Sequence, residues 1–313
     1  MFCSTIIPTI ARPVLSRAVE SVLSQSFQQD DFEVIVVNDS GQPLPEAEWQ
    51  HSERVKIIHT NRRERIFARN SGAAVARGKY LHFLDDDDWL LPGALHSLWE
   101  LAQANPDKHW LYGSSQLFDR LGNLVIQLHH GMEGNCFVQV MAGEWIPMGS
   151  SLILADAFFN VGGFTPLVLA TQDVDLSRKI ALHGDFACTS SIVACFGMGS
   201  DNSSTDYDRG PVYSRWAREK ILYEKGVWVR LRDSARSSYW QGRVVRTYIT
   251  SVVWNLQHRY FFTAASRAIF AIAAFAFAGQ AIFTSGFWQA VARAYRSESF
   301  SSENQEAEIA IQA

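Results

Sequence analysis

Four consecutive aspartates, residues 85–88, follow directly on the apolar stretch 80–84. That stretch contains one polar residue, His82, and its aliphatic and aromatic side chains are typical of a buried β-strand. Adjacent carboxylates repel one another unless a positive charge lies among them, and hard divalent cations prefer such oxygen ligands. In open α/β sheets, ligands bind beyond the carboxyl ends of the strands, where these aspartates fall. The alternative is a solvated acidic turn that caps a helix beginning near Pro92.

Strands and helices alternate along the first ninety residues. Residues 1–8, 32–37 and 55–58 are short apolar runs that indicate strands, and the second is rich in β-branched residues. Helices are expected from Pro13, where apolar residues recur on one face, and over residues 68–76. This alternation has βαβ spacing, so it predicts an α/β domain with a doubly wound, mostly parallel sheet.

The middle of the chain is less regular. Residues 110–118 and 124–128 flank a turn sequence at residues 119–123, which predicts a β-hairpin. Residues 173–183 predict a helix that ends at Gly184.

Charge is segregated along the sequence. Residues 1–208 carry 14 lysines and arginines against 25 aspartates and glutamates, whereas residues 209–296 carry 14 against 3. The last 17 residues contain four glutamates and no basic residue. Such segregation implies two surfaces with different partners. We therefore expect a catalytic domain over residues 1–205, a basic helical extension over residues 206–296, and a disordered acidic tail over residues 297–313.

The four cysteines are scattered along the chain and none forms a Cys-x-x-Cys pair. This pattern indicates reduced thiols in a cytoplasmic protein and argues against a zinc site. The amino terminus shows no export signal. We expect no nucleic-acid partner.

Polar residues also stand at the ends of the first two predicted strands. Pro8 and Thr9 end the first, and Asp39 follows the second just before Ser40 and Gly41. A carboxylate can accept the imide hydrogen of uracil, so Thr9 and Asp39 together could receive a nucleobase. The alternative for Asp39 is an ordinary turn residue.

A group of arginines precedes the strand that carries the four aspartates. Arg62, Arg63 and Arg65 fit a solvated helix face, but Arg69 lies among small residues over 68–74. Small residues would let the backbone approach a ligand, and a guanidinium binds phosphate oxygens in a bidentate fork.

Asp173 falls in the first turn of a predicted helix. The simplest interpretation is a helix cap. The helix dipole would also keep this carboxyl ionised near neutral pH, as a general base requires.

In this order the motifs resemble the family 2 glycosyltransferases over roughly residues 1–205. The resemblance rests on six segments, which are Ile6-Ile7-Pro8-Thr9, residues 18–25, Val36-Val37-Asn38-Asp39-Ser40-Gly41, Arg69-Asn70-Ser71-Gly72 with the strand that runs into Asp85–Asp88, Val161-Gly162-Gly163-Phe164, and Gln172-Asp173-Val174-Asp175-Leu176. Several co-ordered motifs are far more specific than any one of them.

The resemblance implies a GT-A fold and an inverting, nucleotide-sugar-dependent transfer. It assigns donor binding to Pro8, Thr9, Asp39, Arg69, Asp85 and Asp86, the divalent metal (Mg or Mn) to Asp87, the catalytic base to Asp173, and the acceptor side to Gly162, Gly163 and Gln172. The register of the metal motif stays open, because Asp86 and Asp88 have the same spacing as Asp85 and Asp87. The expected partners are a nucleotide sugar of UDP or dTDP type and a glycan or lipid-linked acceptor.

The sequence departs from the family pattern at three places. Gln172 stands where glutamate is frequent, which bears on acceptor handling, and Asn38 replaces a frequent acidic residue. Many members also carry a metal-binding histidine after the last core strand, but residues 196–203 contain none.

Two other functions would fit parts of the pattern. A phosphatase of the haloacid dehalogenase type would use Asp85 as its nucleophile, but Trp89 stands where threonine or valine is usual. A non-catalytic module that binds sugar nucleotides or glycans would not need Asp39, Arg69, Asp85, Asp87 and Asp173 together.

The basic segment 209–296 predicts contact with the cytoplasmic face of a membrane as a peripheral protein. Basic residues are attracted to anionic headgroups, and the segment's tryptophans favour the interface. Its most apolar run, residues 268–283, is sixteen residues long and contains Gln280, so we expect it not to cross, since a span needs ~20 residues. The alternative is that these helices pack on the catalytic domain.

Overall fold

The computed structural model describes residues 1–27, 32–166, 168, 171–197 and 210–292. Two compact units make up this part of the chain. The first contains Met1–Asn135 and Ile146–Ala217, and the second contains Cys136–Trp145 and Arg218–Arg296. The predicted boundary near residue 205 and the predicted acidic tail at 297–313 lie outside the described residues.

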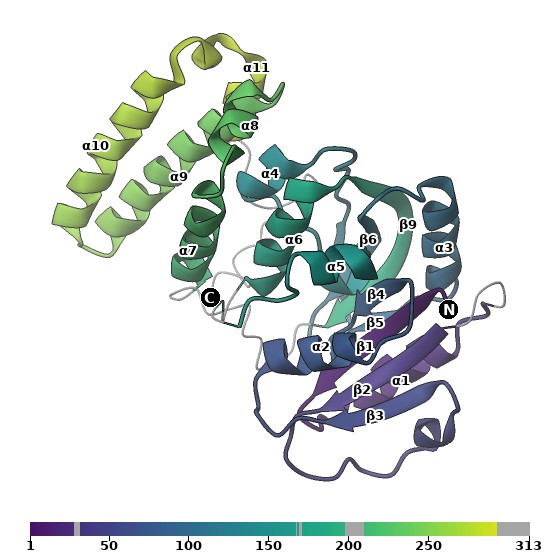
Figure 1. The fold of residues 1–313 in the computed structure, drawn as a ribbon. Coiled ribbons are helices and arrows are strands. Elements are labelled where there is room, and N and C mark those ends of the chain that lie inside the picture. The colour runs from purple at the N-terminus through teal and green to yellow at the C-terminus, as the bar shows by residue number, and fades with distance from the viewer. Residues whose placement is uncertain (28–31, 167, 169–170, 198–209, 293–313) are drawn as a thin grey trace. The chain divides into compact units, whose positions relative to one another are not determined.

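A nine-stranded sheet forms the centre of the first unit (Figure 1). Four strands pair in parallel in the order β3-β2-β1-β4, and their bounds are β1 Cys3–Thr9, β2 Phe32–Asn38, β3 Val55–His59 and β4 Tyr80–Phe83. β4 continues antiparallel to β8 (Ser151–Leu154). The predicted strands are therefore confirmed, and their parallel pairing places their carboxyl ends along one edge.

The second half of the sheet is mixed. It runs β8-β6-β9-β5, and its strands are β5 Trp89–Leu90, β6 Trp110–Phe118, β7 Leu124–Leu128 and β9 Phe186–Gly197. β6 and β7 pair antiparallel, which confirms the predicted hairpin, and β6 pairs in parallel with β9. The predicted α/β fold with a mostly parallel sheet and C-terminal helices is thus observed.

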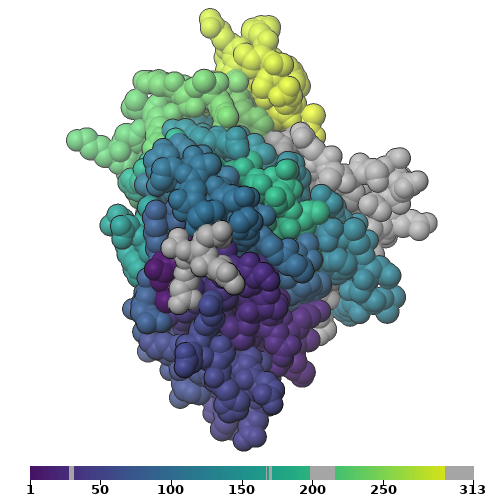
Figure 2. All heavy atoms as spheres, turned by 90° about the vertical axis from the view of Figure 1, so that its right-hand side faces the viewer, coloured from purple at the N-terminus to yellow at the C-terminus, as the bar shows by residue number. Residues whose placement is uncertain are grey.

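Helices cover both faces of this sheet. On one face α1 (Leu15–Leu23) and α3 (Ala94–Ala104) share an apolar core with Ile7, Val34 and Val36. On the other face lie α2 (Arg65–Ala74) and α5 (Ala155–Asn160), and the ring of the α5 residue Phe158 packs against that of Phe83 of β4. The remaining elements of the unit are η1 (Glu48–His51), η2 (Met148–Ser150) and α6 (Gln172–His183). The first unit ends within α7 (Gly210–Leu222). In the space-filling view the purple and blue side chains of the first hundred residues are contiguous (Figure 2).

Gly72 shows why α2 is rich in small residues. A Cβ atom at this position would lie 2.4 Å from Cγ2 of Ile6 and 3.0 Å from Cγ2 of Val37. The absence of a side chain thus allows close packing of the helix on the sheet. The expectation that the small residues around Arg69 admit a ligand is wrong at Gly72, where the sheet takes up that space.

His82, the one polar residue of the strand β4, is completely buried. Its Nε2 donates to the carbonyl oxygen of Gly149 at 2.9 Å, and its Nδ1 lies 3.0 Å from Oγ1 of Thr5. Burial lowers the pKa of His82 to about 4, so the imidazole is neutral at physiological pH. A satisfied neutral histidine can occupy a core position, and this one needs no catalytic role.

The second unit is helical. It contains α4 Phe137–Met141, α8 Val227–Asp233, α9 Ser237–Gln257, α10 Phe261–Ala278, η4 Gly279–Phe283 and α11 Ser285–Ala292. α9 and α10 lie side by side (Figure 1), and Phe287 of α11 belongs to their small apolar core. Arg243 of α9 is buried, and it reaches Glu144 at 3.5 Å and donates to the carbonyl oxygen of Ala142.

The apolar run in this unit is longer than the sequence suggested. Within the described residues, α10 and η4 together form a 23-residue helical segment, Phe261–Phe283, whose best 18-residue window has a mean hydropathy of 1.7, so it is long and apolar enough to cross a membrane. In the sequence the most apolar run starts only at residue 268 and is sixteen residues long, because Thr263, Ser266 and Arg267 interrupt the apolar pattern before it. The premise that the run is too short to span is therefore wrong.

Candidate active site

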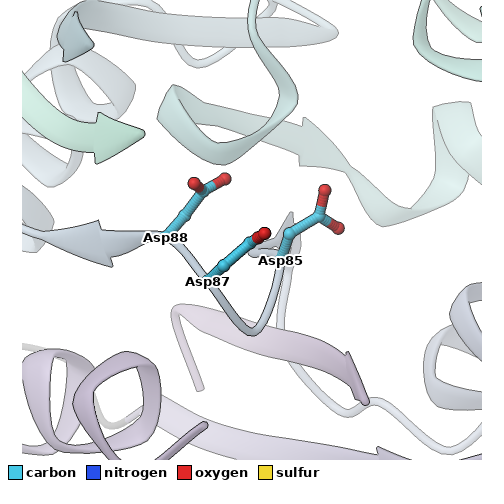
Figure 3. Close-up of side chains that lie close together, drawn as sticks. All are labelled: Asp85, Asp87 and Asp88. Carbon is cyan, nitrogen blue, oxygen red and sulfur yellow. The ribbon is translucent and has the colours of Figure 1, made fainter. Parts of the chain in front are cut away.

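The four aspartates form a tight turn between β4 and β5, and they do not all point the same way. Carboxylate oxygens of Asp85, Asp87 and Asp88 lie within 4.8 Å of one another (Figure 3). Asp86 instead accepts a hydrogen bond from Oγ1 of Thr9 at 2.5 Å. The turn therefore sorts the run into three carboxylates that face a common point and one that anchors the end of β1.

Buried Asp86 is held by two neighbours. Besides Thr9, Nη1 of Arg12 lies 3.3 Å from its Oδ1. Desolvation raises the pKa of Asp86 to about 6, although the Thr9 hydrogen bond and the Arg12 charge act in the opposite direction. The sequence predicts that Thr9 and Asp86 bind the donor. In the structure these two side chains are hydrogen-bonded to each other.

Arginines partly neutralise the other carboxylates. Arg12 donates to Oδ2 of Asp87 at 2.8 Å, and Arg17 donates to the Asp87 carbonyl oxygen at 2.7 Å. The backbone N–H of Gly197 donates to Asp88 at 3.2 Å. Desolvation, followed by the charges of the neighbouring aspartates, raises the pKa of both Asp87 and Asp88. Sequence reasoning missed Arg12 and Arg17, although each follows the end of β1 closely enough to reach its carboxyl edge.

The three converging carboxylates have the chemistry that a hard cation requires. Mg²⁺ and Mn²⁺ prefer carboxylate oxygens, and Mg²⁺ in proteins is usually held by one or two carboxylates together with phosphate oxygens and waters. Asp87 is the ligand predicted from the sequence, whereas Asp88 was considered only as an alternative register. Asp85, Asp87 and Asp88 together fit such an ion.

Arg69 connects the acidic turn to α6. The side chain is buried, and its two terminal nitrogens donate to different partners, Nη1 to Oε1 of Gln172 at 3.1 Å and Nη2 to Oδ1 of Asp85 at 2.5 Å. Its Nε is buried with no hydrogen-bond partner among the described residues. Desolvation opposes ionisation of Asp85, but Arg69, Arg65 and Arg12 outweigh it and lower the pKa of this carboxyl.

Asp173 lies in the first turn of α6, next to Gln172. The charges of Arg69 and Asp85 both act on it, so these three groups lie in one electrostatic neighbourhood. Desolvation raises the pKa of Asp173, and the Val174 backbone and Arg69 oppose that rise. The sequence argument invoked only the helix dipole, which favours the ionised form. A carboxyl with a raised pKa is better matched to accepting a proton near neutral pH.

The loop before α6 is hydrogen-bonded to α2 and to α6. Gly162 and Gly163 have left-handed backbone angles, with φ of 78° and 64°. The Asn70 side chain exchanges two hydrogen bonds with the Phe164 backbone, at 2.9 and 3.0 Å. From the α6 side, Lys179 donates to the carbonyl oxygen of Gly163. The predicted acceptor-side residues Gly162, Gly163 and Gln172 are thus linked to α2, which also carries Arg69.

Asp39 is bonded to its own chain. Its Oδ1 accepts from Oγ1 of Thr60 at 2.8 Å and from the Arg62 backbone N–H at 2.6 Å, and its Oδ2 accepts from the Glu64 backbone N–H at 2.6 Å. The carboxylate therefore holds the segment that leads into α2. The backbone N–H of Asp39 donates to the carbonyl oxygen of Thr9 at 2.8 Å, so Pro8, Thr9 and Asp39 lie along adjacent strand ends.

The metal-binding histidine that many family members carry was expected to be absent from residues 196–203. Of these residues, 198–203 lie outside the described residues.

Comparisons with known proteins agree with this arrangement. Residues 4–122 match the family described as Glycosyl transferase family 2. An uncharacterized glycosyltransferase of Haemophilus influenzae is 25% identical over 58% of this chain and 63% of its own length. The GalNAc(5)-diNAcBac-PP-undecaprenol beta-1,3-glucosyltransferase of Campylobacter jejuni is 34% identical over 39% of this chain and 40% of its own length. The matched segments thus span less than two thirds of these relatives.

The fold also has solved counterparts. The crystal structure of S. aureus TarS residues 1–349 in complex with UDP-GlcNAc superimposes with a TM-score of 0.56 at 12% identity, and the match covers 85% of this chain and 90% of that one. At this identity the likeness concerns the fold. It extends the agreement beyond residue 122, where the sequence match to the family ends.

Proposed function

We propose that this chain, which carries a glycosyltransferase family 2 domain, moves a sugar from a nucleoside diphosphate sugar to an acceptor hydroxyl. One observation carries the proposal. Arg69 of α2 is hydrogen-bonded both to Asp85 of the converging carboxylates and to Gln172 of α6, and the neighbouring half-buried carboxyl of Asp173 feels the charges of Arg69 and Asp85.

Each group has a distinct role in the proposed transfer. Asp87 and Asp88, with Asp85, would hold a divalent cation, Mg or Mn, which when bound supplies positive charge for the leaving diphosphate. Arg69 positions Asp85 through their hydrogen bond. Asp173 accepts the proton of the acceptor hydroxyl while that oxygen bonds to the anomeric carbon. The bond from this carbon to the diphosphate oxygen breaks in the same displacement, so the configuration inverts.

Recognition of the base is proposed for Thr9 and Asp39. A carboxylate offers about four acceptor positions, and Asp39 uses three on the segment at residues 60–64. The remaining position suits the imide N–H of uracil or thymine, which favours UDP or dTDP sugars.

The acceptor is proposed to be a glycan or a lipid-linked glycan. The printed name of the Campylobacter jejuni relative includes an undecaprenol-linked acceptor, which motivates the second choice. A lipid-linked acceptor together with the basic segment 209–296 favours a cytoplasmic enzyme in contact with a membrane.

The decisive experiment compares Asp173→Asn with Asp156→Asn, an exposed carboxyl in the first turn of α5. A panel of nucleotide sugars is first ranked by thermal shift with and without Mn²⁺, because a ligand that binds only the folded state raises its stability. Asp173→Asn should keep the donor-induced shift and lose about 10²–10⁴-fold in transfer, the usual contribution of a general base. Asp156→Asn should keep both.

The alternative is a module that binds sugar nucleotides or glycans without turnover. It predicts a donor-induced thermal shift but no product with any acceptor, for the unmodified chain as well as the variants. Near-normal turnover of Asp173→Asn would instead show that the base is another residue.

A further inference from the structure

The outer surface of α10 and η4 is apolar and exposed. The largest exposed side chains are Phe262, Phe277 and Phe283, with 91%, 88% and 85% of their surface accessible, and Ile269 and Ile272 follow with 68% and 71%. Only 11% of the most apolar 18-residue window of this segment is buried within the protein. A soluble helix normally turns a polar face to water, whereas a helix that is apolar all round needs an apolar environment.

The exposed side chains are not confined to a narrow stripe. At 3.6 residues per turn, Phe262, Ile272 and Phe277 point in directions that span more than a third of the helix circumference, and Phe275 and Phe270 widen this arc to more than half. Another protein helix would cover a narrower stripe than this. Lipid chains surround an embedded helix and can contact the whole arc.

The ends of the apolar segment have the character of a membrane interface. At the turn between α9 and α10, Trp254, His258 and Tyr260 stack on one another with ring centroids 4.0 to 6.5 Å apart. Half-exposed Trp288 stands just beyond the other end. Tryptophan and tyrosine gather at the headgroup level of bilayers. Arg259 stands just before the apolar segment, where its charge would complement anionic headgroups.

α9 shows how deep the helix pair can lie. Arg243 is held by Glu144, and Arg246 donates to the carbonyl oxygens of Val291 and Ala292. These arginines and their bonds belong to the folded helical unit, and a hairpin that crossed the bilayer would carry them into its core, where charge is costly. A helix pair that lies along the interface keeps α9 at the headgroup level and places α10 among the acyl chains.

We propose that α10 and η4 are embedded in one leaflet of a lipid bilayer, with their exposed apolar surface among the acyl chains and α9 towards the headgroups. This deepens the membrane contact that is part of the proposed function, and it replaces electrostatic docking by hydrophobic insertion. The two modes differ in salt dependence, because salt screens exposed charges but does not weaken burial of apolar surface.

Flotation of the full chain with lipid vesicles tests the proposal. Neutral phosphatidylcholine vesicles and vesicles with added anionic phosphatidylglycerol are compared at about 0.1 M and about 1 M salt, where the Debye length falls from ~10 to ~3 Å. We expect flotation with both vesicles, and retention at high salt. Release of the chain at high salt would overturn insertion in favour of electrostatic docking.

A matched pair of variants locates the surface. Ile272→Asp with Phe277→Asp should reduce flotation at least tenfold, because charged groups are excluded from the acyl region. Leu121→Asp, at an 87% exposed apolar position in the β6–β7 turn, should float like the unmodified chain. Equal flotation of all three proteins would place the contact elsewhere and overturn the proposal.

Three further measurements keep the outcome clear. Vesicles with brominated acyl chains should quench tryptophan fluorescence of the unmodified chain, and no quenching would count against insertion even if the variants misfold. Sedimentation without lipid detects a second copy of the chain as the partner, and self-association without flotation would overturn the proposal. Asp173→Asn should float normally, so a failure of the transfer mechanism is distinguishable from a failure of insertion.

Discussion

The two units place charge and apolar surface in opposite ways. In the first unit charged side chains are gathered in a partly buried cluster, where Arg69 pairs with Asp85 and Arg12 with Asp87, and the strands and helices enclose the apolar side chains. In the second unit an arginine is buried and several large aromatic side chains are exposed. The first arrangement suits an anionic ligand and a cation dissolved in water. The second suits the apolar surroundings that we propose for α10 and η4.

Phe287 and Phe277 test that contrast within the second unit. Phe287 is fully buried against Phe275 and Trp288, so Phe287→Ala should lower the free energy of unfolding of this unit by about 3–5 kcal/mol. Phe277→Ala removes an exposed ring and should change it by less than about 0.5 kcal/mol in water. Chemical denaturation without lipid measures both. Equal losses would show that Phe277 is packed against protein in solution.

Substitutions along the acidic run sharpen the description of the first unit. Asp87→Asn and Asp88→Asn should each weaken Mn²⁺ binding about a hundredfold, because each removes one of three converging oxygen ligands. Asp86→Asn should weaken it less than about tenfold, because Asp86 is bound to Thr9. Calorimetric titration with Mn²⁺ decides between them. A larger effect at Asp86 than at Asp88 would reverse the assigned register.

Arg69 tests whether the site is held together by its own charges. Arg69→Ala leaves Asp85 and Gln172 without their shared donor and should cost about 1.5–3 kcal/mol of unfolding free energy. Arg120→Ala, at an exposed position in the β6–β7 turn, should change stability by less than about 0.5 kcal/mol. If both variants unfold at the same denaturant concentration, Arg69 serves the ligand and contributes nothing to the fold.

The pH dependence of metal binding follows from the pKa values of the acidic turn. The pKa values of Asp87 and Asp88, two of the three carboxyls that face the proposed cation, are raised, so these two are protonated more readily than usual as the pH falls. A cation must displace those protons, so its affinity should rise with pH, by up to about tenfold per pH unit for each proton lost. Mn²⁺ titrations from about pH 5 to pH 7.5 measure the slope. A flat profile would mean that these carboxyls stay ionised throughout that range.

Much of the first unit could be predicted because its signals are local. The apolar runs that became β2 and β3 and the hairpin of β6 and β7 are visible as patterns of a few residues, and parallel strands bring their carboxyl ends to one edge. The resemblance to the family then predicted a shared site for Arg69, Asp85 and Asp173, and the structure bonds Arg69 to Asp85. Which aspartate faces the cation could not be predicted, since the choice depends on Thr9, a partner 77 positions away in the chain.

The same limit explains the two errors. Gly72 was interpreted through its sequence neighbours, but its close contacts are Ile6 and Val37, which belong to other elements. The apolar helix of the second unit was shortened because Thr263, Ser266 and Arg267 interrupt the pattern, whereas the backbone continues as a helix through them. Small polar residues and one arginine are compatible with a continuous helix. The polar residues before position 268 therefore do not mark the start of the helix, which begins at Phe261.

Asp39 anchors residues 60–64, so a substitution of Asp39 cannot test base recognition unambiguously. Asparagine at this position would turn an amide NH₂ towards at least one of the donors that the carboxylate now satisfies, and the segment leading into α2 would be disturbed whether or not a nucleotide binds. A weaker affinity of this variant for the nucleotide could result either from the disturbed segment or from the lost contact with the base. Chemistry on the ligand separates them: a uridine nucleotide methylated at N3 lacks the imide hydrogen and leaves the protein untouched.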